Sequence, residues 1–268
     1  MTSPDAQNLS KIWNGFESSP LTVGECRAHG RFQFQKERQR AAYLRSAELL
    51  SGSAKRLLTI FEEDGNYGAV SHLTSDGELL TRDLLDSTAE IGFLLDRIGD
   101  LALDSVIDIG SGYGRMAHRI NALRPDSVVI CADEVPSSRS ICSTYLTLRG
   151  VAGFLVCDFD AAGELTRQHR PILATAVHSF PEMPLKRIRA WLELLTAGGV
   201  DWLFLVPNEP DRLRSTEPDG TRSQFADAID DAGYHLAATG WKYEFGEKDA
   251  YSTNLVYQDQ YLLYRRSA

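Results

Sequence analysis

The pattern of apolar and polar positions divides the chain near residue 100. Before that point, apolar residues recur every three or four positions, which is the spacing of one helix face. This spacing predicts helices over residues 37–50 and 84–98, and Gly52 is the expected stop signal of the first helix. Residues 64–76 are rich in Gly, Asn, Ser and Asp, which indicates a loop or short hairpin. Residues 1–100 are thus predicted to form an N-terminal helical cap or lid.

From residue 105 onward, short apolar runs alternate with helical patterns. Five runs have the length and composition of buried strands: 105–109, 127–132, 153–157, 172–177 and 200–206. The predicted helices are 115–123, 138–148, 185–195 and 223–232. Two late runs, 234–243 and 254–265, have no helix between them, so we expect them to pair antiparallel. Residues 101–268 are therefore predicted to form an α/β domain, a mostly parallel sheet with helices on both faces. In such sheets, ligands bind outside the carboxyl ends of the strands.

The first predicted strand runs directly into a glycine-rich loop. The loop follows Asp108 and consists of Gly110, Ser111, Gly112, Tyr113 and Gly114. Glycine lets a ligand approach the main chain closely, and the N-terminus of the following helix favours an anionic group. A nicotinamide-binding loop would have the spacing GxGxxG, whereas this loop has GxGxG. A nicotinamide site and a tight turn without any ligand are the alternatives.

Acidic residues follow the second and third predicted strands. Asp133 and Glu134 come after the second strand, where a carboxylate can accept both hydroxyl protons of a ribose. Asp158 and Phe159 come after the third. Taken singly, each carboxylate is more simply a solvated turn residue, but their positions after the glycine loop favour a shared ligand.

Candidates for acid–base chemistry and substrate binding follow the fourth and fifth strands. The unperturbed pKa of a histidine side chain, about 6.5, suits a general base, so His178 is the candidate base. Glu182 is the candidate to orient His178 or to act as the base itself. Asn208 and Glu209 have the amide and carboxylate groups that bind carbohydrate hydroxyls. A structural histidine and a proline-rich turn are the alternative interpretations.

At this point the chain resembles the class I S-adenosylmethionine (SAM)-dependent methyltransferases, in particular the bacterial sugar O-methyltransferases. Four segments carry the resemblance: TRDLLDSTAEIGFLL at 81–95, DIGSGYGR at 108–115, HSFPEMP at 178–184 and VPNEP at 206–210. The glycine motif is specific for SAM, and the other segments are less specific for sugar. A fainter likeness connects the chain to actinobacterial enzymes that methylate mannose-type oligosaccharides. The chain lacks the DPPY-type tetrad of DNA amino-methylating enzymes.

The resemblance implies a Rossmann-like, seven-stranded SAM-methyltransferase sheet and a role for each candidate. The glycine loop would wrap the amino-acid end of SAM, and Asp108 would fix the loop and the ammonium group. Asp133, with Glu134 in reserve, would bind the ribose, Asp158 the adenine amino group, and Phe159 would pack near the base. The reaction would be methyl transfer to a sugar hydroxyl, as in polysaccharide biosynthesis. Apart from the resemblance, a lid formed by the N-terminal helices and residues 64–76 would bring Asn66, Tyr67 and His72 into contact with the substrate, and the alternative is a plain surface loop.

Composition and charge narrow the range of partners. The formal net charge of −9 argues against a nucleic-acid substrate, and a small molecule or oligosaccharide is expected instead. Because there is neither an apolar run of about 18 residues nor a secretory signal pattern, we expect a cytoplasmic protein without membrane association. The four cysteines are expected to be reduced core thiols. Oxygen ligands for a divalent cation such as Mg²⁺ are present at Asp158, Asp160 and Glu182, but their spacing establishes no metal site.

Two further classes of function stay open at this stage. A methyltransferase for a non-sugar small molecule would line its pocket with apolar and aromatic groups. A SAM-binding protein without catalysis would bind SAM and its product but transfer no methyl group.

Overall fold

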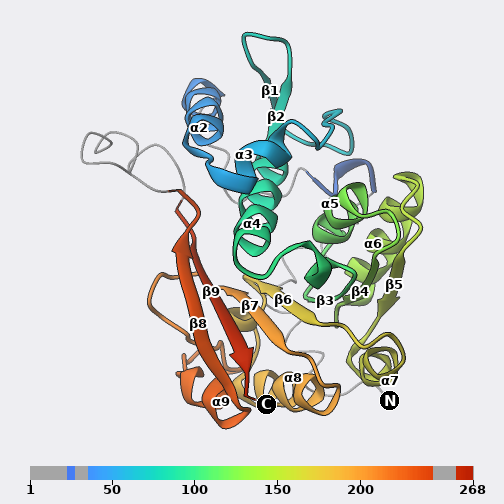
Figure 1. The fold of residues 1–268 in the computed structure, drawn as a ribbon, viewed down its shortest axis with the longest axis vertical. Coiled ribbons are helices and arrows are strands. Elements are labelled where there is room, and N and C mark those ends of the chain that lie inside the picture. Colours follow the sequence, from blue (N-terminus) through green and yellow to red (C-terminus); the bar gives the residue numbers. More distant parts are fainter. Residues whose placement is uncertain (1–22, 28–35, 244–257, 268) are drawn as a thin grey trace. The chain divides into compact units, whose positions relative to one another are not determined.

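The computed structural model of the protein describes residues 23–27, 36–243 and 258–267. These residues form two compact units (Figure 1). The sheet unit contains residues 101–239 and 260–267. The helical unit contains residues 23–27, 36–100, 240–243 and 258–259, so it combines chain that precedes residue 101 with residues inserted between the two segments of the sheet unit.

The sheet unit is built on seven strands in the order β5-β4-β3-β6-β7-β9-β8. Their bounds are β3 Ser105–Ile109, β4 Val128–Ala132, β5 Phe154–Cys157, β6 Leu173–Val177, β7 Trp202–Val206, β8 Tyr234–Trp241 and β9 Gln260–Arg266. The strands from β3 to β7 are paired in parallel, whereas β9 runs antiparallel to β7. The predicted α/β sheet, with its antiparallel last hairpin, is therefore confirmed. Residues 254–257 of the predicted last strand lie outside the described residues.

Helices lie against both faces of this sheet (Figure 1). Their bounds are α5 Arg115–Leu123, α6 Pro136–Leu148, α7 Phe159–His169, α8 Leu185–Ala197 and α9 Ala226–Asp231. A hydrophobic core lies between the sheet and α7, α8 and α9, and Ile107, Ile130, Trp191 and Ile229 belong to it. Burial of these apolar side chains is the main force that holds the layers together.

Two local predictions in the sheet unit were wrong. No helix was predicted after the third strand, yet α7 forms there, because the Asp158 side chain caps it by accepting from the Ala161 N–H at 3.1 Å. The fourth predicted helix is shorter than expected, because residues 213–225 first form an antiparallel hairpin. In this hairpin Ser215 N donates to Ser223 O at 2.8 Å, and Phe225 N donates to Leu213 O at 2.9 Å.

The described residues of the helical unit form three α-helices, short 3-10 helices and one short hairpin. The elements are η1 Val23–Glu25, α2 Lys36–Leu49, α3 Gly52–Leu58, β1 Ser71–Leu73, β2 Leu79–Thr81 and α4 Arg82–Ile98, with η2 Asp100–Leu103 at the unit's boundary. The predicted loop or short hairpin becomes the antiparallel pair β1–β2, which extends to Thr81. The helix predicted over residues 37–50 is α2, which ends at Leu49 before Gly52, as expected; Gly52 has φ +54° and also begins the next helix, α3.

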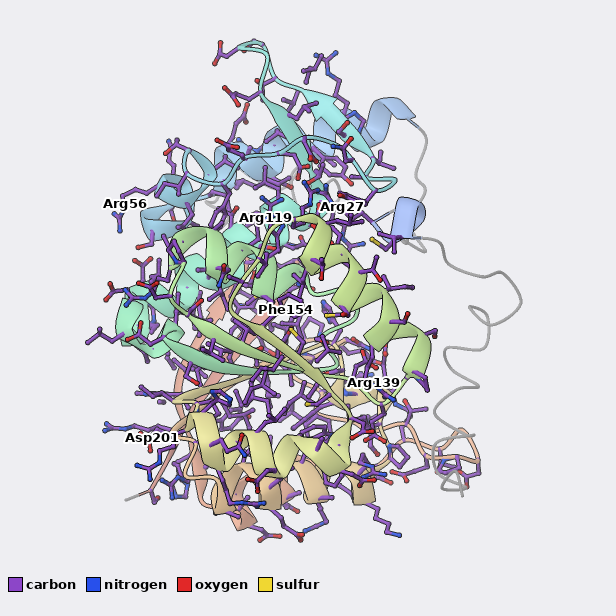
Figure 2. All side chains as sticks on the ribbon, turned by 90° about the vertical axis from the view of Figure 1, so that its right-hand side faces the viewer. Arg27, Arg56, Arg119, Arg139, Phe154 and Asp201 are labelled. Atoms are coloured by element: carbon purple, nitrogen blue, oxygen red, sulfur yellow. The ribbon has the colours of Figure 1, made fainter. Side chains whose placement is uncertain are left out.

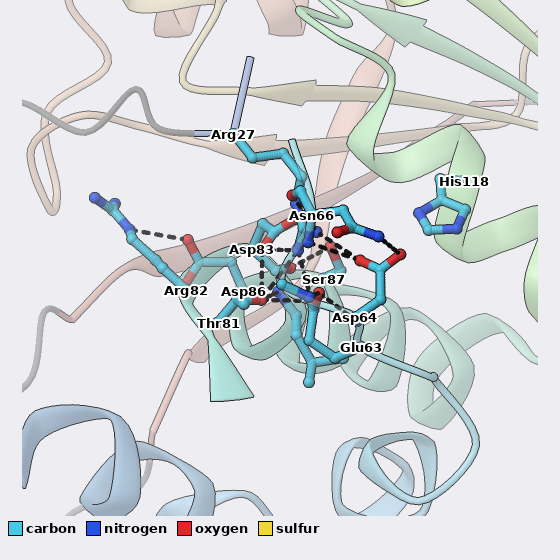
Figure 3. A network of polar contacts seen from close by, with 12 residues as sticks. Arg27, Glu63, Asp64, Asn66, Thr81, Arg82, Asp83, Asp86, Ser87 and His118 are labelled. Carbon is cyan, nitrogen blue, oxygen red and sulfur yellow. Dashed lines mark hydrogen bonds and ion pairs between the residues drawn. The ribbon is translucent and has the colours of Figure 1, made fainter. Parts of the chain in front are cut away.

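A buried arginine joins three segments of the helical unit (Figure 3). The Arg27 side chain is fully buried and donates to both carboxylate oxygens of Asp83 at 2.8 Å and to Glu63 at 2.5 Å. Its backbone N–H donates to Tyr67 O at 3.0 Å. Burial by itself lowers the pKa of Arg27, but the hydrogen bonds to Asp83 and Glu63 more than offset it and raise the pKa, so the guanidinium stays charged. Arg27 thus fixes the loop that follows α3 against the start of α4.

The cysteines match the prediction of buried thiols. Cys26, Cys131, Cys142 and Cys157 are all free and buried. Within the described residues, no helix has the length and apolar character needed to cross a bilayer.

Candidate active site

The carboxyl ends of β3, β4, β5, β6 and β7 lie along one edge of the sheet because these strands are parallel. The strand order reverses at β3, which has β4 and β5 on one side and β6 and β7 on the other. In open α/β sheets such a switch point is where ligands bind. The other site residues predicted in the α/β domain each follow one of these strand ends: Asp133 and Glu134 follow β4, Asp158 and Phe159 follow β5, His178 and Glu182 follow β6, and Asn208 and Glu209 follow β7.

The glycines of the loop after β3 have different surroundings. Gly110 has φ +75°, and its N–H donates to Ala132 O at 2.8 Å. A Cβ at this position would overlap the Cβ of Ser179, so the loop and the β6 connection approach each other closely at Gly110. Gly112 also has a positive φ, +56°, but a Cβ there would meet no atom within 4 Å. Gly110 is therefore needed for packing, whereas Gly112 borders open space.

Asp108, in the strand that precedes the glycine loop, is buried inside the sheet unit. It is 4% exposed and accepts a hydrogen bond from the Thr175 hydroxyl of β6 at 2.6 Å. Burial raises the pKa of Asp108, and the Thr175 hydrogen bond and the charge of Arg115 offset this only in part. The carboxylate thus links β3 to β6 directly beneath the glycine loop.

Asp133 connects the end of β4 to the same loop. One carboxylate oxygen accepts from Gly112 N at 3.1 Å, and the other accepts from Val135 N at 2.9 Å. Burial raises the pKa of Asp133 to about 6, although these two backbone hydrogen bonds act in the opposite direction. A carboxylate has about four acceptor positions, so about two remain for a ligand.

The neighbouring acidic and aromatic candidates are held by α7 and α8. Glu134 forms an ion pair with Arg187 of α8 at 3.0 Å, and burial still raises the pKa of Glu134. The Arg187 guanidinium also lies 4.5 Å above the Phe159 ring. Phe159 packs edge-on against Trp191 with ring centroids 4.8 Å apart. Glu134 and Phe159 are thus rigidly placed beside the ends of β4 and β5.

Arg139 is a residue of this region that the sequence analysis missed (Figure 2). It lies on α6 and donates to the Asp133 carbonyl at 2.8 Å. Its guanidinium is also 3.9 Å from the Asp158 carboxylate. The available signal was a cation placed shortly after the acidic pair at the end of β4. Arg139 links the second and third strand ends.

The connection after β6 carries the two candidates for acid–base chemistry. His178 has φ +61°, which is unusual for a residue with a side chain, and its N–H donates to Val206 O at 2.9 Å. Ser179 follows, and its hydroxyl donates to Ile109 O at 2.6 Å. Glu182 lies in the short helix η3 Phe180–Glu182, and its backbone N–H donates a hydrogen bond to Ser179 O at 3.1 Å. A strained backbone held by neighbours on both sides is typical of functional sites.

The connection after β7 carries Asn208 and Glu209 and continues into the 213–225 hairpin. Asn208 is half-buried, and Glu209 forms an ion pair with Arg212 at 3.1 Å. The hairpin is fastened to the β6 connection, because Thr216 N donates to Met183 O at 3.0 Å and the Thr216 hydroxyl donates to Pro181 O at 2.7 Å. The fourth and fifth strand ends are therefore joined by one continuous set of contacts.

The remaining candidates belong to the helical unit. Tyr67 has φ +61° and its carbonyl accepts from Arg27 N. His72 lies on β1 with its ring 4.9 Å from that of Tyr43. Burial and the charge of Arg40 lower the pKa of His72. The Asn66 side chain donates to Asp64 at 2.8 Å. Contact of these residues with a substrate stays a prediction.

In the part of the chain that the structure describes, no group of three or more His, Cys, Asp or Glu side chains is placed to hold a metal ion. Of the oxygen ligands considered from the sequence, Asp158 serves as the cap of α7 and Asp160 is exposed in its first turn.

The strand order, the reversed strand β9 and the glycine loop after β3 define the class of fold, which is the seven-stranded α/β sheet that the methyltransferase resemblance implied. No protein-family model and no curated protein sequence matches this chain.

Several solved structures are similar to the chain in fold. Magnesium protoporphyrin IX methyltransferase from Synechocystis PCC 6803, with bound SAM, has a TM-score of 0.46 and 15% identity over 69% of this chain and 83% of its own. Mitomycin 7-O-methyltransferase has a TM-score of 0.46 and 15% identity over 68% of this chain and 57% of its own. Precorrin-6y C5,15-methyltransferase from Geobacter metallireducens has a TM-score of 0.42 and 12% identity over 63% of this chain and 85% of its own.

Proposed function

We propose that this protein is a SAM-dependent methyltransferase that transfers a methyl group to a hydroxyl of a sugar or oligosaccharide. The observation that carries the proposal is the set of groups around the glycine loop. Gly112 borders open space, and the buried Asp133 carboxylate holds the loop while keeping acceptor positions for a ligand.

A second observation supports a ligand at this loop. The Ser111 hydroxyl is buried, and among the described residues it has no hydrogen-bond partner. Unpartnered buried polar groups are uncommon in folded proteins and call for a physical explanation. A polar ligand over the loop would provide the missing partner, so these residues fit the amino-acid and ribose parts of SAM.

The proposal assigns a role to each strand end. The glycine loop and Ser111 hold the amino-acid part, Asp133 accepts from the ribose hydroxyls, and Asp158 and Phe159 hold the adenine. SAM, when bound, supplies a methyl group on a sulfonium that an oxygen nucleophile can attack. The chain's own part is to orient the acceptor, exclude water and remove the hydroxyl proton.

His178 is our candidate for the base that takes this proton, with Glu182 as the group that orients it or replaces it. A sugar hydroxyl is a poor nucleophile, and a positioned base contributes roughly 10²–10⁴ in rate. The strained His178 backbone and its short connection to Glu182 support this assignment. Asn208 and Glu209, together with Tyr67 and His72 from the proposed lid of residues 1–100, are the candidate acceptor contacts.

Calorimetric titration with S-adenosylhomocysteine, beside NAD as a control, tests the cofactor. We expect micromolar binding of S-adenosylhomocysteine alone. No binding, or binding of NAD instead, would refute the proposal.

Turnover of labelled SAM with a panel of sugar, phenol, carboxylic acid and amine acceptors then tests the reaction. Transfer only to non-sugar acceptors would favour a small-molecule methyltransferase, and binding without any transfer would favour a non-catalytic protein. We expect His178→Ala to lower turnover at least about 10²-fold with unchanged cofactor affinity. Full turnover in both His178→Ala and Glu182→Ala would refute the base assignment.

A further inference from the structure

The 213–225 hairpin presents two different faces. Its strands are paired through the backbone bonds Ser215 N to Ser223 O, Glu217 N to Thr221 O and Phe225 N to Leu213 O. Ser215 and Phe225 are buried, and Leu213 packs against the main core, so this face points inward. Because side chains alternate along a strand, Arg214 and Thr216 share the opposite face.

Arg214 lies between the two connections that carry the acceptor candidates. Thr216, on the same face, bonds to the Pro181 carbonyl directly before Glu182. On the other side, Arg222 donates to the Arg214 carbonyl at 3.2 Å and lies 3.8 Å from Glu209. Arg214 is therefore adjacent to the connections that follow both β6 and β7.

The Arg214 side chain differs from the arginines around it. Arg212 is paired with Glu209, Arg222 donates to backbone carbonyls, and Arg187 is paired with Glu134. Arg214 is half-buried, yet among the described residues its guanidinium has neither an ion-pair nor a hydrogen-bond partner. A partly buried guanidinium is stabilised by an anionic partner, and its geometry suits the two oxygens of a carboxylate or phosphate.

We propose that Arg214 binds an anionic substituent of the acceptor, so that the substrate is a sugar carrying a carboxylate or a phosphate group. This inference rests on the proposed function, because it places the acceptor at the ends of β6 and β7. Arg214 then acts as a specificity residue that fixes the sugar by its charged group while the reacting hydroxyl faces His178.

The hairpin is firm enough for such a role. Asp211 and Gln260 of β9 exchange two hydrogen bonds, from Asp211 N to the Gln260 side chain and from that side chain to the Asp211 carboxylate, both at 2.7 Å. At its far end, the Glu217 carboxylate accepts from Leu185 N at 3.0 Å. These contacts attach the hairpin to β9 and to the start of α8, so Arg214 projects from a fixed backbone.

Binding measurements with three hexose probes, which differ only in the group at carbon 6, test the proposal. Protein saturated with S-adenosylhomocysteine is titrated with glucose, glucuronate and glucose 6-phosphate. We expect at least one charged probe to bind about tenfold or more tightly than glucose, and the better of the two identifies carboxylate or phosphate. In Arg214→Met this preference should disappear, whereas Arg214→Lys should retain part of it.

Arg189→Met is the matched control, because it removes the same charge from a surface arginine of α8 that pairs with Asp231. It should keep the preference for the charged probe. The proposal is overturned if glucose binds as well as both charged probes, or if Arg214→Met and Arg214→Lys both keep the full preference. The proposed function is tested separately by S-adenosylhomocysteine affinity, which should be the same in wild type and Arg214→Met. If wild type binds no S-adenosylhomocysteine, titration with the three sugars alone still measures whether Arg214 gives a preference for the charged probes.

Discussion

At the scale of single residues, Asp133 combines two tasks in one carboxylate. It holds the glycine loop through Gly112 N and keeps acceptor positions for a ribose. The same burial that makes its hydrogen bonds strong also raises its pKa to about 6. Its charge is therefore sensitive to pH near the lower end of the physiological range.

Affinity for S-adenosylhomocysteine should fall as the pH drops below about 6, because protonated Asp133 accepts hydrogen bonds poorly. Asp133→Asn should bind about tenfold more weakly at pH 7.5 and show little change between pH 5 and 7.5. Titrations at several pH values measure both effects. Equal pH dependence in the two proteins would contradict the role of Asp133.

The stability of the ligand-free protein should show the opposite pH dependence. Because the pKa of Asp133 is higher in the folded than in the unfolded protein, its favourable contribution is complete below pH about 4 and is lost as the pH rises through about 6. The difference in unfolding free energy between wild type and Asp133→Asn, measured by urea unfolding across this range, isolates the contribution.

Two glycines of the loop should separate packing from binding. Gly110→Ala introduces a Cβ that overlaps Ser179 at a positive φ, so it should lower the unfolding free energy by about 3 kcal/mol. Gly112→Ala meets no atom and should cost only about 1 kcal/mol from its positive φ. Gly112→Ala should nevertheless weaken S-adenosylhomocysteine binding at least tenfold. Normal binding in a folded Gly112→Ala variant would show that the loop does not contact the ligand.

At the scale of elements, α7 shows how a single side chain sets both a helix and a site. Asp158 starts the helix by accepting from Ala161 N, and its other oxygen faces Arg139. These contacts hold the third strand end to α6 and to the start of α7, whose buried residues are Ala162 and Thr166.

Substitutions of Asp158 can separate its capping role from its proposed contact with adenine. Serine is also a good cap, so Asp158→Ser should keep the stability of wild type, whereas Asp158→Ala should lose about 1 kcal/mol. Both variants should bind S-adenosylhomocysteine more weakly, because both lack the carboxylate. If Asp158→Ser binds as well as wild type, the carboxylate is only a cap.

At the scale of the whole molecule, the helical unit depends on a buried lysine contributed from beyond β8. The Lys242 ammonium contacts Asp86 of α4 and lies 3.0 Å from Asp259. Burial by itself lowers the pKa of Lys242, but the two carboxylates more than offset it and raise the pKa, so Lys242 stays charged. Lys242, directly after β8, and Asp259, directly before β9, thus both contribute to the helical unit.

Lys242→Met would remove the ammonium beside the buried Asp259 carboxylate, while Asp86 would keep its ion pair with Arg82, and it should destabilise the helical unit by about 3 kcal/mol. If this unit is the acceptor lid, S-adenosylhomocysteine affinity should stay within about twofold of wild type while methyl transfer is lost. Lys55→Met, at an exposed position of α3, is the control and should change neither the stability of the helical unit nor methyl transfer. Normal turnover in Lys242→Met, with the unit shown to be unfolded, would exclude a lid function.

The sequence alone determined the order and kind of most elements. Short runs of β-branched and apolar residues, as at Ser105–Ile109, favour strands that are covered on both faces, and their alternation with helical patterns indicates a parallel sheet. The glycine spacing after Asp108 and the carboxylates after the next strands were visible for the same reason, because parallel strands bring their carboxyl ends to one edge. The polar helix α7 was missed because its start depends on one cap rather than on an apolar pattern.

Only the tertiary structure decided how these residues are used. Ser179 packs on Gly110, Asp133 accepts from Gly112 N, and Arg139 contacts Asp158, and each of these contacts joins different elements of the chain. The local sequence cannot encode such contacts, because they depend on how separate elements pack. The role proposed for the half-buried Arg214 was likewise invisible, since the sequence does not distinguish it from Arg212 and Arg222 in the same connection. Its place between two strand ends exists only once the hairpin has folded against η3.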